Sequence, residues 1–146
     1  MAKIENLFLE AEQIIEKAKR KLKSALILSD KGQTEDVISR SYYAVFHAAK
    51  ALLLIVGERP RTHNGTLTLF GLKLIKENVV DKKLGKILSE QFQARQVDDY
   101  ELFSYYEDSE LQHFLTDADY FIKESEKYLK KMKNNILNSK NSNQSS

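Results

Sequence analysis

The spacing of apolar residues is the feature that most constrains how this chain folds. Between residues 4 and 25 the apolar positions are separated by steps of four and three, which places them on one face of a helix. The same spacing returns in later segments, and the single proline and five glycines supply few helix breakers. The pattern therefore predicts an all-α fold, a bundle of four to five helices around one core.

Residue types that favour helix ends divide the chain into these helices. Gly57, with Pro60 just beyond it, is typical of a helix C-terminus and predicts the end of the second helix. The third helix contains Gly65 and Gly71, which weaken it, so we expect it to be short or irregular. The candidate N-cap residues are Thr34, Thr62 or Asn64, Asp81, and Ser109, the last with Gln112 in a capping-box spacing.

Length and composition indicate one domain followed by a tail. The 146 residues suffice for a single core, which we assign to residues 1–133. Residues 134–146 are mostly Asn, Ser, Lys and Gln, and such a segment is predicted to be a disordered polar tail. The N-terminus lacks the pattern of a secretory signal, and the longest apolar run is much shorter than the ~20 residues of a membrane span. We therefore expect a cytoplasmic protein without membrane association.

A polar stripe on the second helix is the first candidate for a functional surface. Arg40, Tyr43, His47 and Lys50 fall within roughly 80° of one another on a helix whose other sides are apolar. One interpretation is that these side chains lie at the edge of the bundle or pair with acids of a neighbouring helix. The other is a contact surface for nucleotide or RNA, because Arg and Lys bind phosphate oxygens while Tyr and His stack on bases.

Three blocks of sequence together resemble the small stand-alone HEPN proteins of prokaryotes. The blocks are RSYYAVFHAAKA from Arg40 to Ala51, then His63 and Gly65 with Phe70, then Arg95 with Asp99 and Tyr100. The resemblance extends from about Ile4 to Met132. It implies an up-and-down helical bundle that forms a homodimer. It also implies pairing with a minimal nucleotidyltransferase, in arrangements that act as toxin and antitoxin.

The resemblance also locates a candidate ribonuclease motif, in which one residue departs from the family pattern. Active members carry an arginine, four to six residues, and then a histidine, which is the general base for metal-independent RNA cleavage while arginine stabilises charge on the phosphate. Here Arg95 is present, but Tyr100 stands where the histidine should be. A phenol, with a reference pKa of about 10, is a poor general base at pH 7. Efficient nuclease activity is therefore not expected.

Several roles for the residues around this motif stay open. Arg95 can form a structural ion pair with Asp98 or Asp99, or it can bind a ligand together with Tyr100. His47 would supply the missing imidazole if the second and fourth helices are neighbours. Tyr100 would alternatively accept a nucleotidyl group from the partner enzyme.

Metal and cofactor sites are not expected from the sequence. The chain has no cysteine, and its histidines, His47, His63 and His113, are widely spaced, with none four residues from another. A basic cluster on the first helix, from Lys17 to Lys23, is interpreted as a solvated face or as a surface that contacts RNA or a partner.

These observations give one preferred function and two alternatives. The preferred function is that of a non-catalytic or weakly catalytic HEPN protein, paired with a minimal nucleotidyltransferase and binding nucleotide or RNA through Arg40, Tyr43, His47, Lys50, Arg95, Asp99 and Tyr100. The first alternative is a metal-independent endoribonuclease toxin that tolerates Tyr100. The second is a homodimeric scaffold without chemistry.

Overall fold

The chain folds into a bundle of helices with short connections. The computed structural model describes residues 2–100 and 106–144, with side chains over 3–97 and 106–139. The elements are α1 (Ala2–Asp30), α2 (Thr34–Ile55), α3 (His63–Phe70), the π-helical turn η1 (Gly71–Ile75), α4 (Lys82–Tyr100) and α5 (Asp108–Gln144). The described residues contain no strand. The predicted all-α fold is therefore confirmed.

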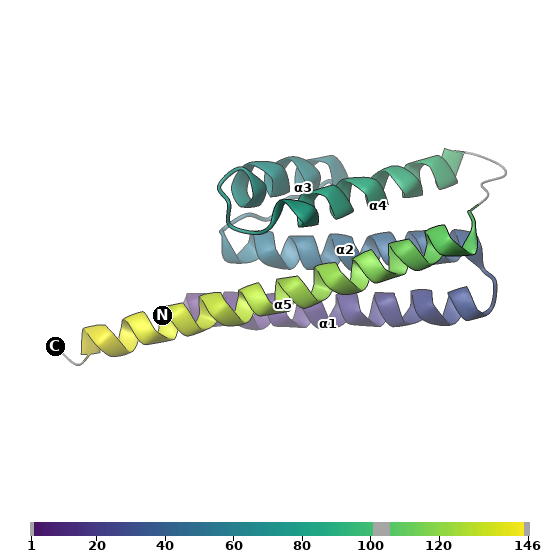
Figure 1. Cartoon of the computed structure of the whole chain (residues 1–146). Helices are drawn as coiled ribbons and strands as arrows, with labels where there is room; N and C mark the ends of the chain where they lie inside the picture. The colour runs from purple at the N-terminus through teal and green to yellow at the C-terminus, as the bar shows by residue number, and fades with distance from the viewer. Residues whose placement is uncertain (1, 101–105, 145–146) are drawn as a thin grey trace.

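The long helices run up and down along a common direction (Figure 1). Helices α1 and α2 are antiparallel neighbours, α5 packs against both, and α4 packs on α2 with the short α3 beside it. Both chain ends lie at the same end of the bundle, where α5 continues past the start of α1 (Figure 1). Helix α2 is therefore the central element, since it contacts α1, α3, α4 and α5.

The core is built from the apolar faces that the sequence spacing predicts. On α1 the positions from Phe8 to Ala25 are buried, whereas Ile4 at the end of the stripe is exposed. Helix α2 is buried on most sides, with Tyr42 and Leu52 completely inaccessible, as its central place requires. Burial of such side chains is the main favourable term in folding. No helix among the described residues is long and apolar enough to cross a membrane.

The predicted helix ends are confirmed at three places. The Thr62 side chain accepts a hydrogen bond from the Gly65 amide at 2.9 Å, which selects Thr62 over Asn64 as the cap of α3. Asp81 accepts from the Lys83 amide at 2.8 Å and caps α4. Gly57 ends α2 with a φ of +88°, a conformation that glycine adopts without steric strain.

Two other predicted caps are wrong by one or two residues. Gln33, rather than Thr34, occupies the N-cap of α2, and its side chain makes no capping hydrogen bond. At α5 the Glu110 carboxylate accepts a hydrogen bond from the Glu107 amide at 3.3 Å, so the capping contact lies before Ser109 and the helix begins at Asp108. Acids at a helix N-terminus are favourable whichever of them contacts the backbone, and the sequence pattern alone therefore does not select one.

The C-terminal segment differs from the predicted disordered tail. Helix α5 continues without a break through residue 133 to Gln144. Ile136 is partly buried, extends the apolar stripe of Leu129 and Met132 by one more turn, and packs against the core. With Leu137 it contributes to a groove of about 350 Å³ against Ile4 and Phe8 of α1. The polar composition of residues 134–146 obscured these two apolar positions.

Candidate functional site

Helices α2 and α4 bring an arginine onto a cluster of aromatic rings. The Arg95 guanidinium lies over the Tyr43 ring at 4.7 Å from its centroid and over the Tyr42 ring at 5.3 Å. Tyr43 is stacked in turn on His47, with 6.2 Å between ring centroids. We call these residues, together with Phe46, Lys50, His63 and Phe92, the Arg95 cluster. A cation held over aromatic faces is stabilised by the ring quadrupole.

A buried hydrogen-bond network fixes the position of Arg95 on α4. The Ser41 hydroxyl of α2 donates to the Gln91 side-chain oxygen at 2.9 Å, and the Gln91 amide donates to the Phe114 carbonyl of α5 at 2.9 Å. Ser41 and Gln91 are fully buried, where an unsatisfied polar group would be costly. Because Gln91 lies one turn before Arg95, the network sets the rotation of α4 that places the guanidinium over α2.

The start of α3 adds a histidine to the cluster. His63 stacks on Phe46 with 4.5 Å between centroids, and its Nδ1 lies 2.6 Å from the Tyr42 hydroxyl. The Thr62 cap next to it requires glycine at position 65, because a Cβ there would come within 2.8 Å of the Thr62 hydroxyl oxygen. The His-x-Gly pattern thus has a local structural reason. Glycine permits the tight helix start that turns the imidazole toward α2.

Burial and positive neighbours keep both imidazoles of the cluster neutral. Burial lowers the pKa of His47 to about 4, helped by Lys17, Lys50 and Lys21. Burial also lowers the pKa of His63, with Arg95 and Lys50 acting in the same direction. At pH 7 both rings are therefore in the form that can accept a proton.

The proton on His63 can be placed from the same argument. Burial raises the pKa of the Tyr42 hydroxyl, so this phenol keeps its proton. The hydroxyl therefore donates a hydrogen bond to His63 Nδ1. The neutral His63 ring then carries its own proton on Nε2. The pair thereby satisfies a phenol that is completely buried.

The structure brings together most, but not all, of the residues that the sequence singled out. Tyr43, His47, Lys50 and Arg95 belong to one cluster; the Lys50 amine lies 5.5 Å from the Phe46 ring. Arg40 is exposed on α2 one turn before Tyr43. The side chains of Asp98, Asp99 and Tyr100 lie outside the described residues, so their predicted contacts with Arg95 stay predictions.

Four members of the cluster, Tyr42, Phe46, His63 and Phe92, were not predicted as site residues. Tyr42 is completely buried, but its hydroxyl also contacts His63. The ring centroid of Phe92 lies 5.9 Å from that of Tyr42. A polar atom on a buried tyrosine needs a partner, and this requirement was the available signal for His63.

Comparison with known proteins identifies the family. The model of the HEPN domain matches residues 11–136. The chain belongs to the HEPN family. It is 33% identical to a protein of Methanocaldococcus jannaschii named "Putative toxin", over 92% of this chain and 90% of the relative. A second protein of that organism with the same designation is 32% identical over 84% of this chain and 91% of the relative. A UPF0332 protein of Thermotoga maritima is 30% identical over 85% and 97%.

Within this HEPN chain the cluster has the chemistry of a contact surface for an anion with a planar ring. Arg95 and Lys50 supply positive charge, and Tyr43 with His47 supplies aromatic faces. All four are partly exposed, so a ligand can reach them. The hypothesis that His47 replaces the missing imidazole required α2 and α4 to be neighbours, and they are. The rings directly under the guanidinium are nevertheless those of Tyr43 and Tyr42, and His47 is stacked on Tyr43.

Proposed function

We propose that this HEPN protein is a member of a toxin–antitoxin pair and binds single-stranded RNA or a nucleotide through the Arg95 cluster. Its partner is a minimal nucleotidyltransferase, and it acts as a homodimer. The role in a toxin–antitoxin pair is supported by two relatives with the name "Putative toxin", which are similar to this chain over most of their length. The side chains of the cluster support the binding of RNA or a nucleotide, because they combine cations with ring faces.

The stacking of Arg95 on Tyr43 is the observation that carries this proposal. A guanidinium can bind a phosphate while an aromatic ring beside it stacks on a base, so the two groups together suit a nucleotide. Lys50 on the same face of α2, and Lys17 and Lys21 near His47, extend the positive field along the surface. A phosphate backbone that follows this surface would place a base against Tyr43 or His47.

Binding with little cleavage follows from the residue at the position of the motif histidine. A tyrosine there lacks a group that accepts a proton near pH 7, and general-base catalysis contributes about 10²–10⁴-fold to the rate. Arg95 can still stabilise negative charge on a bound phosphate. We therefore expect the protein to retain affinity for RNA but to cleave it at a much lower rate than a family member with the motif histidine.

A combined binding and cleavage assay tests the proposal. Fluorescein-labelled single-stranded RNA is titrated with wild type, Arg95→Ala, Tyr100→His and the control Lys123→Ala in the presence of chelator. Lys123 is an exposed cation of α5 paired with Asp119, so its loss changes the net charge without altering the cluster. We expect wild type to bind without cutting, Arg95→Ala to bind about tenfold more weakly, and Lys123→Ala to change affinity less than about twofold.

The outcomes of the assay separate the proposal from its alternatives. Cleavage by wild type that Arg95→Ala abolishes would make the protein a ribonuclease. Cleavage by Tyr100→His alone would support a site that has lost its base and kept its binding surface. Absence of RNA and nucleotide binding in all four proteins would leave the scaffold alternative.

The second candidate function is a metal-independent endoribonuclease that uses an imidazole from another helix. It is favoured by the neutral states of His47 and His63 in the same cluster as Arg95. The same assay separates it from the binding function. A ribonuclease of this kind loses its activity in His47→Gln or His63→Gln while RNA affinity is largely kept, and unchanged cleavage in both variants would refute it.

The partner and the oligomer are tested by co-expression. We expect the chain to elute as a dimer in size-exclusion chromatography with light scattering. We also expect it to be retained by a tagged nucleotidyltransferase from a neighbouring reading frame. A monomer that the tagged enzyme does not retain would contradict this part of the proposal.

A further inference from the structure

A second group of side chains lies on the opposite side of α4, between α4 and α5. Glu90 of α4 and His113 and Asp117 of α5 each offer one possible ligand atom, and these atoms all lie within 4.8 Å of one another. His113 Nε2 is 3.1 Å from the Asp117 carboxylate, one helical turn along α5. One imidazole and two carboxylates form a mixed nitrogen and oxygen donor set, which suits Zn²⁺ and related divalent transition metals.

The burial of Asp117 is the second observation that points to a cation. The Asp117 side chain is 11% exposed, and its described partner is His113, which belongs to the same group. A buried carboxylate needs compensating charge, and a second carboxylate converging on it increases that need. Lys86 lies near Glu90, but at 3.9 Å and with an exposed side chain, so it compensates the buried charge weakly.

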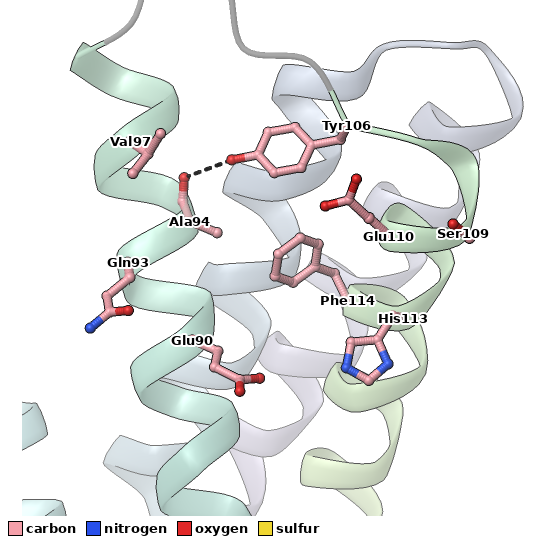
Figure 2. Close-up of a pocket in the computed structure, with 9 residues that line it drawn as sticks. All are labelled: Glu90, Gln93, Ala94, Val97, Tyr106, Ser109, Glu110, His113 and Phe114. Atoms are coloured by element: carbon pink, nitrogen blue, oxygen red, sulfur yellow. Dashed lines mark hydrogen bonds between the residues drawn. The ribbon is translucent and has the colours of Figure 1, made fainter.

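A cavity gives the group an open side. Glu90 and His113 line a space of about 480 Å³ whose other walls include Ala94, Tyr106 and Phe114. Figure 2 shows the Glu90 carboxylate and the His113 imidazole facing each other across this space from α4 and α5, with the Tyr106 hydroxyl donating to the Ala94 carbonyl at its upper end. Three protein ligands and an open fourth position are typical of zinc sites that also bind water or a small ligand.

We propose that Glu90, His113 and Asp117 bind one Zn²⁺ ion between α4 and α5, with its open position toward this cavity. Ligand atoms about 2.1 Å from a tetrahedral ion lie about 3.4 Å apart, close to the 3.1 Å between His113 and Asp117. Glu90 completes the set by a change of rotamer, because its carboxylate already lies within 4.8 Å of the other two ligand atoms. The site does not depend on the RNA-binding proposal, because it uses a different face of α4.

Zinc binding to the tag-free chain tests the site directly. Isothermal titration with ZnCl₂ and absorption spectra with Co²⁺ are recorded for wild type, His113→Gln, Glu90→Gln and Asp117→Asn. The matched control is Asp119→Asn, a carboxylate of the same helix that pairs with Lys123 at 2.8 Å. We expect one ion per chain, at least about tenfold weaker binding in each of the three ligand variants, and wild-type affinity in the control.

Thermal unfolding distinguishes a variant that has lost its zinc ligand from one that does not fold. His113 is exposed, so His113→Gln should fold like wild type without metal, while only wild type gains in Tm as zinc is added. The proposal is overturned if wild type shows neither heat nor a Co²⁺ spectrum. It is equally overturned if His113→Gln binds as tightly as wild type, because the ion would then sit elsewhere.

Discussion

The lowered pKa of His47 predicts a loss of stability as the pH falls, and the loss should be specific to this residue. His47 packs on Tyr43, and Lys17 and Lys21 of α1 and Lys50 of α2 act on it electrostatically. Its pKa is about 4 in the folded chain, against 6.5 for an unperturbed histidine. Below pH 6.5 His47 is therefore protonated in the unfolded chain, whereas in the folded chain it stays neutral down to about pH 4.

The sign of the effect follows from proton linkage. Stability falls as the pH falls wherever the unfolded state binds more protons, which here is the window between about pH 6.5 and pH 4. Taken at face value, a shift of this size corresponds to about 3 kcal/mol over the full window. Because the ring is only half-buried, solvent screening reduces this to about 1–2 kcal/mol, of which about 1 kcal/mol is lost by pH 5.

Urea unfolding at pH 7.5, 6.0 and 5.0, followed by circular dichroism, measures this loss in wild type and in His47→Gln. The variant lacks the titrating ring and keeps His63, whose own lowered pKa contributes equally to both proteins. We expect the stability difference between the two proteins to shrink by about 1 kcal/mol between pH 7.5 and pH 5. A difference that stays constant across this range would refute the argument that burial and the lysines hold His47 neutral.

Two further predictions concern the contact of Arg95 with Tyr43 and the packing of Ile136 on the core. Unfolding in urea is measured for Arg95→Ala, Tyr43→Leu and the double variant. The two substitutions should show a coupling free energy of about 0.5–1 kcal/mol. Additive effects would mean that the guanidinium and the ring do not stabilise each other. Ile136→Ser should lower stability by about 1 kcal/mol because the side chain packs on the core. Ser139→Ala, at an exposed position, is the neutral control. Equal Tm values for wild type and Ile136→Ser would support a disordered tail instead.

The helices were predictable because their signal is local and repeated. Each turn of α1 and α5 places an apolar residue on the same face, so an error at one position is corrected by its neighbours. The end of α5 is the exception for the same reason. Beyond residue 133 only Ile136 and Leu137 continue the stripe, and a composition rich in Asn and Ser outweighed them.

Only the site residues that lie together on one helix could be predicted from the sequence. The stripe from Tyr43 to Lys50 lies on α2 and was found from its angular spacing, but the contact of Tyr42 with His63 joins residues 21 positions apart. No local pattern encodes such a contact. The His113 and Asp117 pair has a local signal, a spacing of four on one helix, which the spacing between histidines does not reveal.

Helix α4 links the two sites, because its opposite faces serve different neighbours. Arg95 faces α2, Glu90 faces α5, and the buried Gln91 joins all three helices through Ser41 and the Phe114 carbonyl. A rotation of α4 would lift the guanidinium from the tyrosine rings and separate Glu90 from α5 at the same time. An ion bound between α4 and α5 would oppose that rotation. The metal site would then act on RNA binding by holding Arg95 in place, without contacting the RNA itself.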